Sequence, residues 1–321
     1  MRTSVKKSLL VMALLLVCEC TIFGGPNYAF GDSTEVLPPL PASSSFMDQI
    51  DEAACYAVEE PTQPALLRWD FGRKEVYAYD YSQKSIMTSI MSERPGGGDR
   101  NEPGMVTEVK GKMSLKSEGD RTARLVMEDL MMSMQFETSE REEPKTMDSE
   151  APPMVIQGVQ EDGTMKLGSS SQEMLLKMLF PIPSSPLRVG ESVSSPRAVP
   201  FNAMGSLLEV TGSSVTTLTG YVGLDGKTCA RLETVIDISN LNVPEELEGT
   251  YKCQVKGKSV FFFDIEGKRF LSGRVALIMG MRVKAPMPRM HLPSEAEDVG
   301  LPETISMSMD NDTFISVDYV D

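Results

Sequence analysis

Residues 271–284 read LSGRVALIMGMRVK, in which apolar and polar side chains alternate. The apolar members are Leu271, Val275, Leu277, Met279, Met281 and Val283, and the polar members are Ser272, Arg274, Arg282 and Lys284. Successive side chains of a β-strand point to opposite faces, so the pattern predicts a strand with one buried and one solvated face. Such strands are typical of antiparallel sheets.

The same alternation occurs in residues 105–116, whose apolar face carries Met105, Val109, Met113 and Leu115. Near the C-terminus it occurs on both sides of Asp310-Asn311-Asp312, which we expect to form a turn. Between residues 123 and 136 the parity of the apolar positions switches near Glu128 and Asp129. A β-bulge in a long, bent strand explains that switch.

An acidic residue followed by glycine recurs between the alternating segments, as is typical of tight hairpins. The four predicted turns are Glu118-Gly119-Asp120, Asp162-Gly163, Asp225-Gly226-Lys227 and Glu266-Gly267-Lys268. The sequence therefore predicts a mainly β fold: a large curved antiparallel sheet, half-barrel or sandwich with one or two short helices. The similar spacing of the hairpins suggests an internal two-fold repeat, with halves near residues 66–168 and 201–321.

The first 31 residues have the features of a signal peptide. They combine the basic residues Arg2, Lys6 and Lys7, the apolar run from Leu9 to Val17, and the small residues Ala29 and Gly31. We expect cleavage before Asp32, no membrane span in the mature chain, and a periplasmic or extracellular location. Residues 32–65 are rich in proline, serine and acidic residues, which predicts a flexible linker with a possible short helix over residues 45–58.

One helix is predicted with defined ends. Ser170 and Glu173 form a capping box, apolar residues follow at helical spacing, and Pro181 ends the helix. Closely spaced prolines then favour an extended crossover. Residues 169–200 would thus join the two halves of a β domain that spans residues 66–321.

The net charge limits the partners of the chain, and the number of cysteines limits its disulfides. The net charge of −15 argues against nucleic acid as a partner. Cys55, Cys229 and Cys253 remain after the signal peptide, and an odd number cannot all pair within one chain. If the strands around Cys229 and Cys253 form one hairpin, Cys229 lies opposite about residue 260, so we expect buried free thiols unless the register shifts.

Residues 179–192 read LFPIPSSPLRVGES. This run resembles a phrase in exported bacterial β-rich proteins of unknown function, although Val193 occupies a place where those proteins have an aromatic residue. The resemblance implies a curved antiparallel sheet over about residues 66–321, similar to lipoprotein-carrier half-barrels. It implies no activity.

Catalytic chemistry finds little support in the sequence. The candidate carboxylates Asp225, Glu233, Asp237 and Asp264 lie in predicted turns or on polar strand faces. The single histidine, His291, lies in a predicted loop, and no Gly-x-Ser-x-Gly motif accompanies it. We therefore predict no enzyme, no catalytic residues and no cofactor, with an envelope hydrolase that uses carboxylates as an alternative.

Methionine is unusually frequent, with 23 residues. The pairs Met132 and Met134, Met279 and Met281, and Met307 and Met309 each share a strand face. Thioethers bind cuprous ion, so a copper-binding protein that also uses Met287, Met290 and His291 is a second alternative. Methionine also fills irregular cores and adapts to hydrophobic ligands.

The sequence favours a non-catalytic, exported cell-envelope or periplasmic protein. It would bind a lipid or another hydrophobic ligand, or act as an interaction scaffold for an envelope protein. The predicted ligand face consists of Met113, Leu115, Val275, Leu277, Met279 and Met281, and we predict no metal site.

Overall fold

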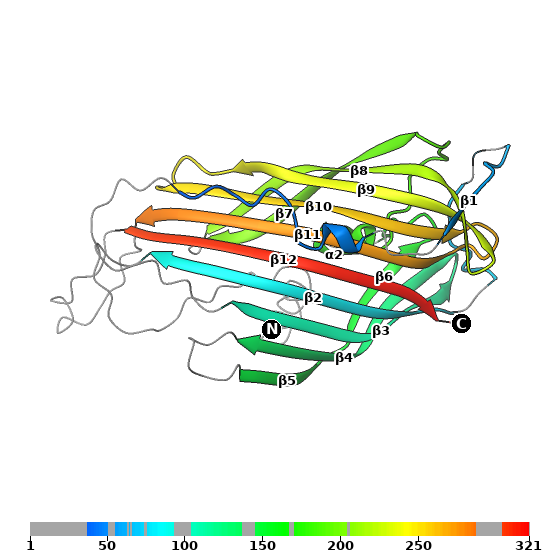
Figure 1. Cartoon of the computed structure of the whole chain (residues 1–321), viewed down its shortest axis with the longest axis horizontal. Coiled ribbons are helices and arrows are strands. Elements are labelled where there is room, and N and C mark those ends of the chain that lie inside the picture. The colour runs from blue at the N-terminus through cyan, green and yellow to red at the C-terminus, as the bar shows by residue number, and fades with distance from the viewer. Residues whose placement is uncertain are drawn as a thin grey trace.

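The computed structural model of the chain describes residues 37–50, 55–62, 64, 66–73, 76–92, 104–136, 145–166, 170–203, 206–286 and 304–320. The predicted signal peptide and the loop around His291 lie outside these residues. The described part is mainly β, as predicted: twelve strands form one large antiparallel sheet, accompanied by one short α-helix (Figure 1).

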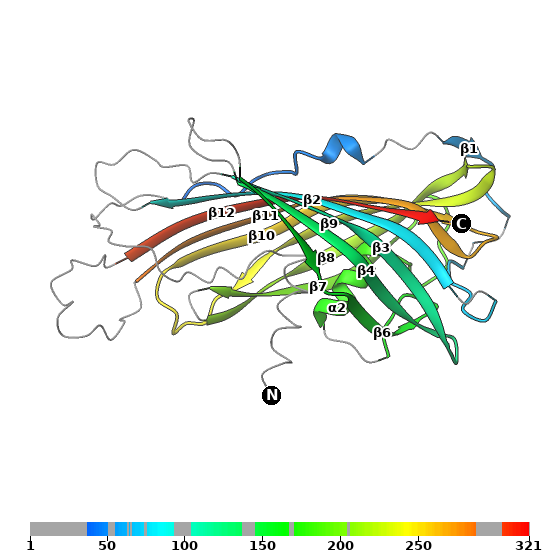
Figure 2. The same ribbon diagram turned by 90° about the horizontal axis from the view of Figure 1, so that it is seen from below.

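Long hairpins make up most of the sheet. The strands are β1 (Tyr56–Val58), β2 (Val76–Ser92), β3 (Met105–Gly119), β4 (Thr122–Phe136), β5 (Lys145–Ala151), β6 (Met154–Gln160), β7 (Ser192–Ala203), β8 (Ser206–Leu224), β9 (Lys227–Asn242), β10 (Thr250–Asp264), β11 (Arg269–Pro286) and β12 (Thr304–Val320). They pair in the order β1-β8-β9-β10-β11-β12-β2-β3-β4-β5, with β6 beside β4 and β7 beside β8. The sheet is therefore open at two ends, and it is strongly curved (Figure 2).

The turns and the bulge follow the sequence pattern. Asp225 and Gly226 join β8 to β9 with φ angles of 50° and 73°, the left-handed values that the predicted tight turn requires. Asp129 has a φ of 55°, and the register between β3 and β4 shifts beside it. The predicted bulge is thus confirmed.

The predicted turn at Asp310-Asn311-Asp312 is wrong, because β12 runs through these residues without interruption. Alternation continues through the segment: Asn311 is buried, while the two aspartates lie on the opposite face. Asp310 forms an ion pair with Arg282, and Asp312 accepts a hydrogen bond from Ser44. Partners on that face allow acidic residues to occupy the middle of a strand.

The concave face of the sheet carries the larger core. Helix α2 (Ser170–Leu179) has the predicted ends and lies against this face (Figure 2). Its buried leucines continue into an aromatic group, in which the ring of Phe180 lies 5.2 Å from Trp69 and 5.4 Å from Phe270. The contact with Trp69 is edge-to-face and that with Phe270 is tilted, and aromatic contacts add to the gain from burial, so the C-terminal end of α2 is firmly packed.

The convex face is covered in part by residues 37–50, although the sequence pattern favours a flexible linker there. Phe46 and Ile50 are 6% and 2% exposed and pack on a second apolar cluster. The guanidinium of Arg282 donates a hydrogen bond to the carbonyl oxygen of Pro39 at 2.9 Å. Phe46 and Ile50, four residues apart, therefore anchor this segment on the sheet, which its proline-rich composition does not predict.

The short helix predicted over residues 45–58 differs from what the structure shows. Met47–Gln49 form a single 3-10 turn, η1, and β1 follows as a short strand beside β8. Residues 51–54 lie outside the described part.

Candidate functional site

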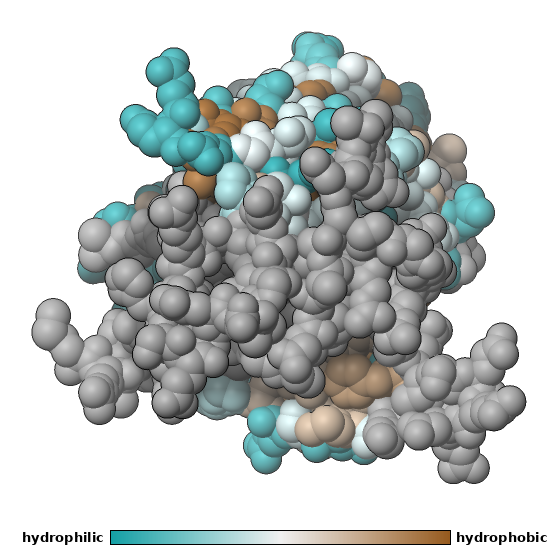
Figure 3. Space-filling model, turned by 90° about the vertical axis from the view of Figure 1, so that its left-hand side faces the viewer, coloured by the Kyte–Doolittle hydropathy of each residue, from teal (hydrophilic) through white to brown (hydrophobic). Residues whose placement is uncertain are grey.

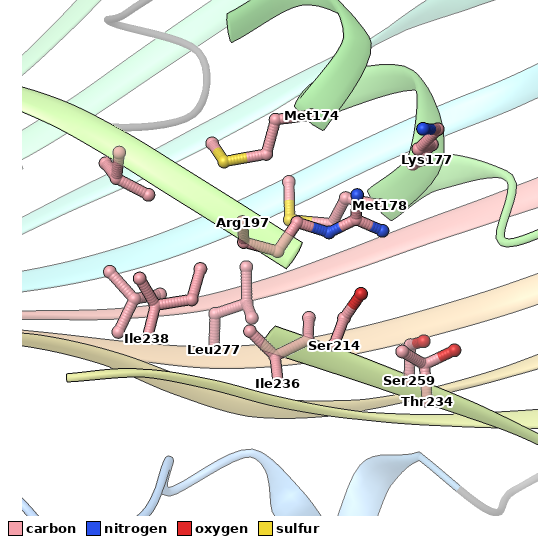
Figure 4. Close-up of a pocket in the computed structure, with 12 residues that line it drawn as sticks. Met174, Lys177, Met178, Arg197, Ser214, Thr234, Ile236, Ile238, Ser259 and Leu277 are labelled. Atoms are coloured by element: carbon pink, nitrogen blue, oxygen red, sulfur yellow. The ribbon is translucent and has the colours of Figure 1, made fainter. Parts of the chain in front are cut away.

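A cavity of about 50 Å³ lies between α2 and the concave face of β7 to β11 (Figure 4). Met174 and Met178 of α2 face it from one side. Its apolar floor and walls come from Val199, Ile236, Ile238, Val255 and Leu277. One water needs roughly 10–15 Å³ of such space, so the cavity has room for a few small groups. Flexible methionine side chains can enlarge it.

Three hydroxyl groups interrupt the apolar floor. Ser214, Thr234 and Ser259 line the cavity and are 2%, 4% and 2% exposed. The hydroxyl of Thr234 lies 3.0 Å from that of Thr216, so these two groups hydrogen bond to each other. The Ser214 hydroxyl has no hydrogen-bond partner among the described residues. It is therefore a buried polar group available to a ligand.

Two cationic side chains line the cavity. Lys177 forms an ion pair with Glu173, one helical turn earlier in α2. Arg197 of β7 is half-buried; desolvation lowers the pKa of its guanidinium, and the carboxylate of Glu173 raises it in part. Within the described part of the chain, no hydrogen bond or ion pair engages the Arg197 side chain.

A wider groove of about 950 Å³ borders the cavity and shares Met174, Lys177 and Arg197 with it. Beneath the groove, Gly212 lets β8 approach β9 closely, since a Cβ atom there would lie 2.2 Å from the carbonyl oxygen of Asp237. The register between β8 and β9 also shifts between Thr211 and Gly212. Backbone irregularity thus shapes the polar mouth of the apolar cavity.

The six residues of the predicted ligand face are all buried on the concave face. They are Met113, Leu115, Val275, Leu277, Met279 and Met281. Leu277 lines the cavity, and its neighbours on β11 belong to the surrounding core. β3, which carries the other two, is separated from β11 by β12 and β2.

Two residues of the cavity, Arg197 and Ser214, are not among the predicted site residues. A signal for Ser214 is present, because hydroxyl residues interrupt the row of alternate apolar positions between Val210 and Leu218. No comparable signal marks Arg197, which lies among the prolines of the predicted crossover. β7 is paired along β8, and prolines are tolerated in such an outer strand.

Two of the four candidate carboxylates, Glu233 and Asp264, have structural partners. Asp264 is buried, accepts hydrogen bonds from the backbone N–H groups of Glu266 and Gly267, and pairs with Arg269. Glu233 forms ion pairs with Arg231 and Lys258. These contacts stabilise a turn and a strand face.

The described residues give no support to a metal site of hard or nitrogen ligands. Over the described ranges, no cluster of three or more histidine, cysteine, aspartate or glutamate residues is arranged to hold a metal ion. The pairs Met279 and Met281, and Met307 and Met309, lie in the core. The other proposed copper ligands, residues 287, 290 and 291, fall outside the described part, so the copper alternative stays a prediction.

The cysteines are unpaired, as expected. Cys229 and Cys253 are buried and free, while Cys55 is exposed and free. Cys229 lies opposite Asp264 in the β9–β10 register. Burial raises the pKa of both Cys229 and Cys253 to about 12, which keeps these thiols protonated.

Exposed apolar residues are scattered over the surface. Large examples are Tyr56, Leu66, Met131, Met147, Val155 and Val235. On the end of the molecule seen in Figure 3, small hydrophobic areas alternate with hydrophilic ones. Scattered exposure of this kind does not mark a docking site. None of the helices in the described residues is long and apolar enough to cross a membrane.

Comparisons with known proteins place the chain in no family. No family model matches it, and no curated protein matches it. Among solved structures, a match to "Enduracididine biosynthesis enzyme MppR complexed with pyruvate" has 11% identity, covers 76% of this chain and 90% of the other, and has a TM-score of 0.10. A match to the same enzyme with HEPES bound has 11% identity, covers 83% and 99%, and also scores 0.10. Likeness this weak carries no argument about fold or function.

Proposed function

We propose that the chain is a non-catalytic, exported cell-envelope protein that binds the apolar part of a small hydrophobic ligand. The cavity between α2 and the concave sheet face carries this proposal. Export rests on the signal-peptide pattern of residues 1–31. Binding sites for small molecules are typically concave and mostly apolar, with a few well-placed polar groups.

The methionines of α2 that face the cavity allow it to widen for a ligand. The buried side of α2 consists of leucines, whereas Met174 and Met178 face the cavity and are only half-buried. Methionine has three rotatable bonds, so both side chains can move aside without unpacking the helix. A hydrophobic group could thus enter while α2 stays docked.

The test is binding of Nile red, an uncharged fluorescent dye, to the chain without residues 1–31. Met178→Trp fills the cavity with an indole ring that the dye would have to displace. A packing cost of about 1–3 kcal/mol corresponds to dye binding weakened about fivefold or more. Met131→Trp is the matched control, because Met131 is 55% exposed on β4, away from the cavity. That variant should bind the dye like the unchanged chain.

Native mass spectrometry after mild purification gives an independent measurement. A carrier should retain an adduct with the mass of a small hydrophobic molecule, and Met178→Trp should lack it. Absence of saturable dye binding together with absence of an adduct would overturn the proposal, and the interaction-scaffold alternative would then be favoured.

A further inference from the structure

Arg197 differs from the other arginines that are not exposed. Among the described residues these are Arg68, Arg231, Arg269, Arg274 and Arg282, and each has a hydrogen-bonded or ionic partner. Arg197 has none within the described residues, although it lines the cavity. The Glu173 carboxylate acts on Arg197 without forming an ion pair with it, so the guanidinium keeps N–H donors in a fixed fork that can bind an anion.

Ser214 provides a second, independent observation. Its hydroxyl is buried without a hydrogen-bond partner among the described residues, and it lines the same cavity. Ser214 pairs with Ser195 across β7 and β8, while Arg197 pairs with Gly212. Arg197 and Ser214 are therefore diagonal neighbours on one face, about 7–8 Å apart at the backbone, a span that one small anion and a long side chain can bridge.

Charge around the site selects the kind of anion. The chain carries a net charge of −15, and Glu173 is already paired with Lys177 at the mouth. One unpaired guanidinium can balance one negative charge, and a dianion would meet the repulsion of this acidic surface. Apolar side chains occupy the other walls, which favours an alkyl tail.

We propose that the pocket takes a small amphipathic monocarboxylate. Its carboxylate accepts hydrogen bonds from the Arg197 guanidinium and the Ser214 hydroxyl, and its alkyl tail contacts Met174, Met178 and Ile236 (Figure 4). This assignment rests on the proposed function and adds the chemical class of the ligand.

Displacement of Nile red by octanoate, 1-octanol, octyl phosphate and acetate tests the assignment. Octanoate should bind at least about tenfold more tightly than 1-octanol and more tightly than octyl phosphate, and acetate should bind far more weakly. In Arg197→Met the preference for octanoate over 1-octanol should disappear while 1-octanol still binds. Ser214→Ala should weaken octanoate about fivefold.

Arg188→Met is the matched control, since Arg188 is exposed and the variant removes the same charge. It should keep the octanoate preference. Should Arg197→Met fail to fold, Arg197→Gln carries the same prediction. Equal binding of octanoate and 1-octanol to the unchanged chain, tighter binding of octyl phosphate, or an unaltered preference in Arg197→Met would overturn the inference and leave the proposed function standing. Failure of both octanoate and 1-octanol to displace the dye would count against both.

Discussion

Replacing Asp310 by alanine probes the ion pair beneath the N-terminal segment. Arg282 has a side chain only 5% exposed, and its Nη1 and Nη2 atoms lie 2.6 Å and 3.0 Å from the two carboxylate oxygens of Asp310. The same guanidinium donates hydrogen bonds to the carbonyl oxygens of Met281, Met309 and Pro39. Asp310→Ala would therefore leave a buried cation with carbonyl partners only.

The expected loss follows from this geometry. Removing one partner of a buried ion pair costs about 3–5 kcal/mol. The remaining carbonyl bonds, and the 32% exposure of the Asp310 side chain, place the loss near the lower end, at about 3 kcal/mol. Arg282→Met should cost less, about 1–2 kcal/mol, because it removes the buried charge and leaves a carboxylate that water can reach.

Urea unfolding followed by the fluorescence of Trp69 measures these losses, because Trp69 is the only tryptophan and is 2% exposed. Asp318→Ala is the control: Asp318 pairs with Arg274, but its side chain is 44% exposed, so its loss should stay below about 1 kcal/mol. An Asp310→Ala loss no larger than that of the control, or smaller than that of Arg282→Met, would refute the reasoning.

Three further predictions concern packing and thiols. Gly273→Ala should lower the free energy of unfolding by about 1–3 kcal/mol, because its Cβ would lie 1.9 Å from the ring of Phe261. Gly220→Ala is the control: a Cβ there would meet nothing within 4 Å, so the change should stay below about 0.5 kcal/mol. Equal losses for the two variants in urea unfolding would contradict this prediction. In the chain without residues 1–31, iodoacetamide at pH 8 should label Cys55 and spare the two buried thiols, since thiolates react and both buried groups stay protonated; mass spectrometry that finds three labels on that folded chain would contradict it. Phe46→Ala should cost about 3 kcal/mol in the same urea titration, and a loss below 1 kcal/mol would mean that the N-terminal segment adds little to the convex face.

The two-residue period predicted the strands because one face of each strand packs on the concave core. It also located the bulge at Asp129, where the parity of burial has to change. β11 departs from the half-buried pattern, since residues 275–283 are buried on both faces. Arg282, expected on a solvated face, is covered by residues 37–50, and periodicity within one strand contains no information about such a distant cover.

The candidate site was harder to predict, because α2 and five strands meet there. The alternation of apolar and polar residues in 271–284 predicted Leu277 as part of the ligand face. Arg197 and Ser214 become neighbours only through the pairing of β7 with β8. Pairing of that kind depends on a crossover from β6 at one end of the sheet to β7 at the other. Local patterns do not specify that path, so they do not bring these residues together.

Buried polar side chains on the concave face differ in whether they have hydrogen-bond partners, and the difference between a paired row and the cavity is consistent with a ligand there. Across β2 and β12, Tyr81 donates to Gln83 at 2.7 Å, Gln83 donates to Ser85 at 3.0 Å, and the hydroxyl of Ser85 lies 3.0 Å from that of Thr313. Each of these four side chains therefore has a hydrogen-bond partner within the row, as a buried polar network requires if it is to stabilise a core. At the cavity, the buried Ser214 hydroxyl lacks a hydrogen-bond partner among the described residues, and the half-buried Arg197 beside it feels the Glu173 carboxylate without an ion pair to it. Leaving the Ser214 hydroxyl unpaired costs free energy, because it is removed from water without a compensating hydrogen bond. A bound molecule with an acceptor group would remove that cost at the place where the core leaves room for one.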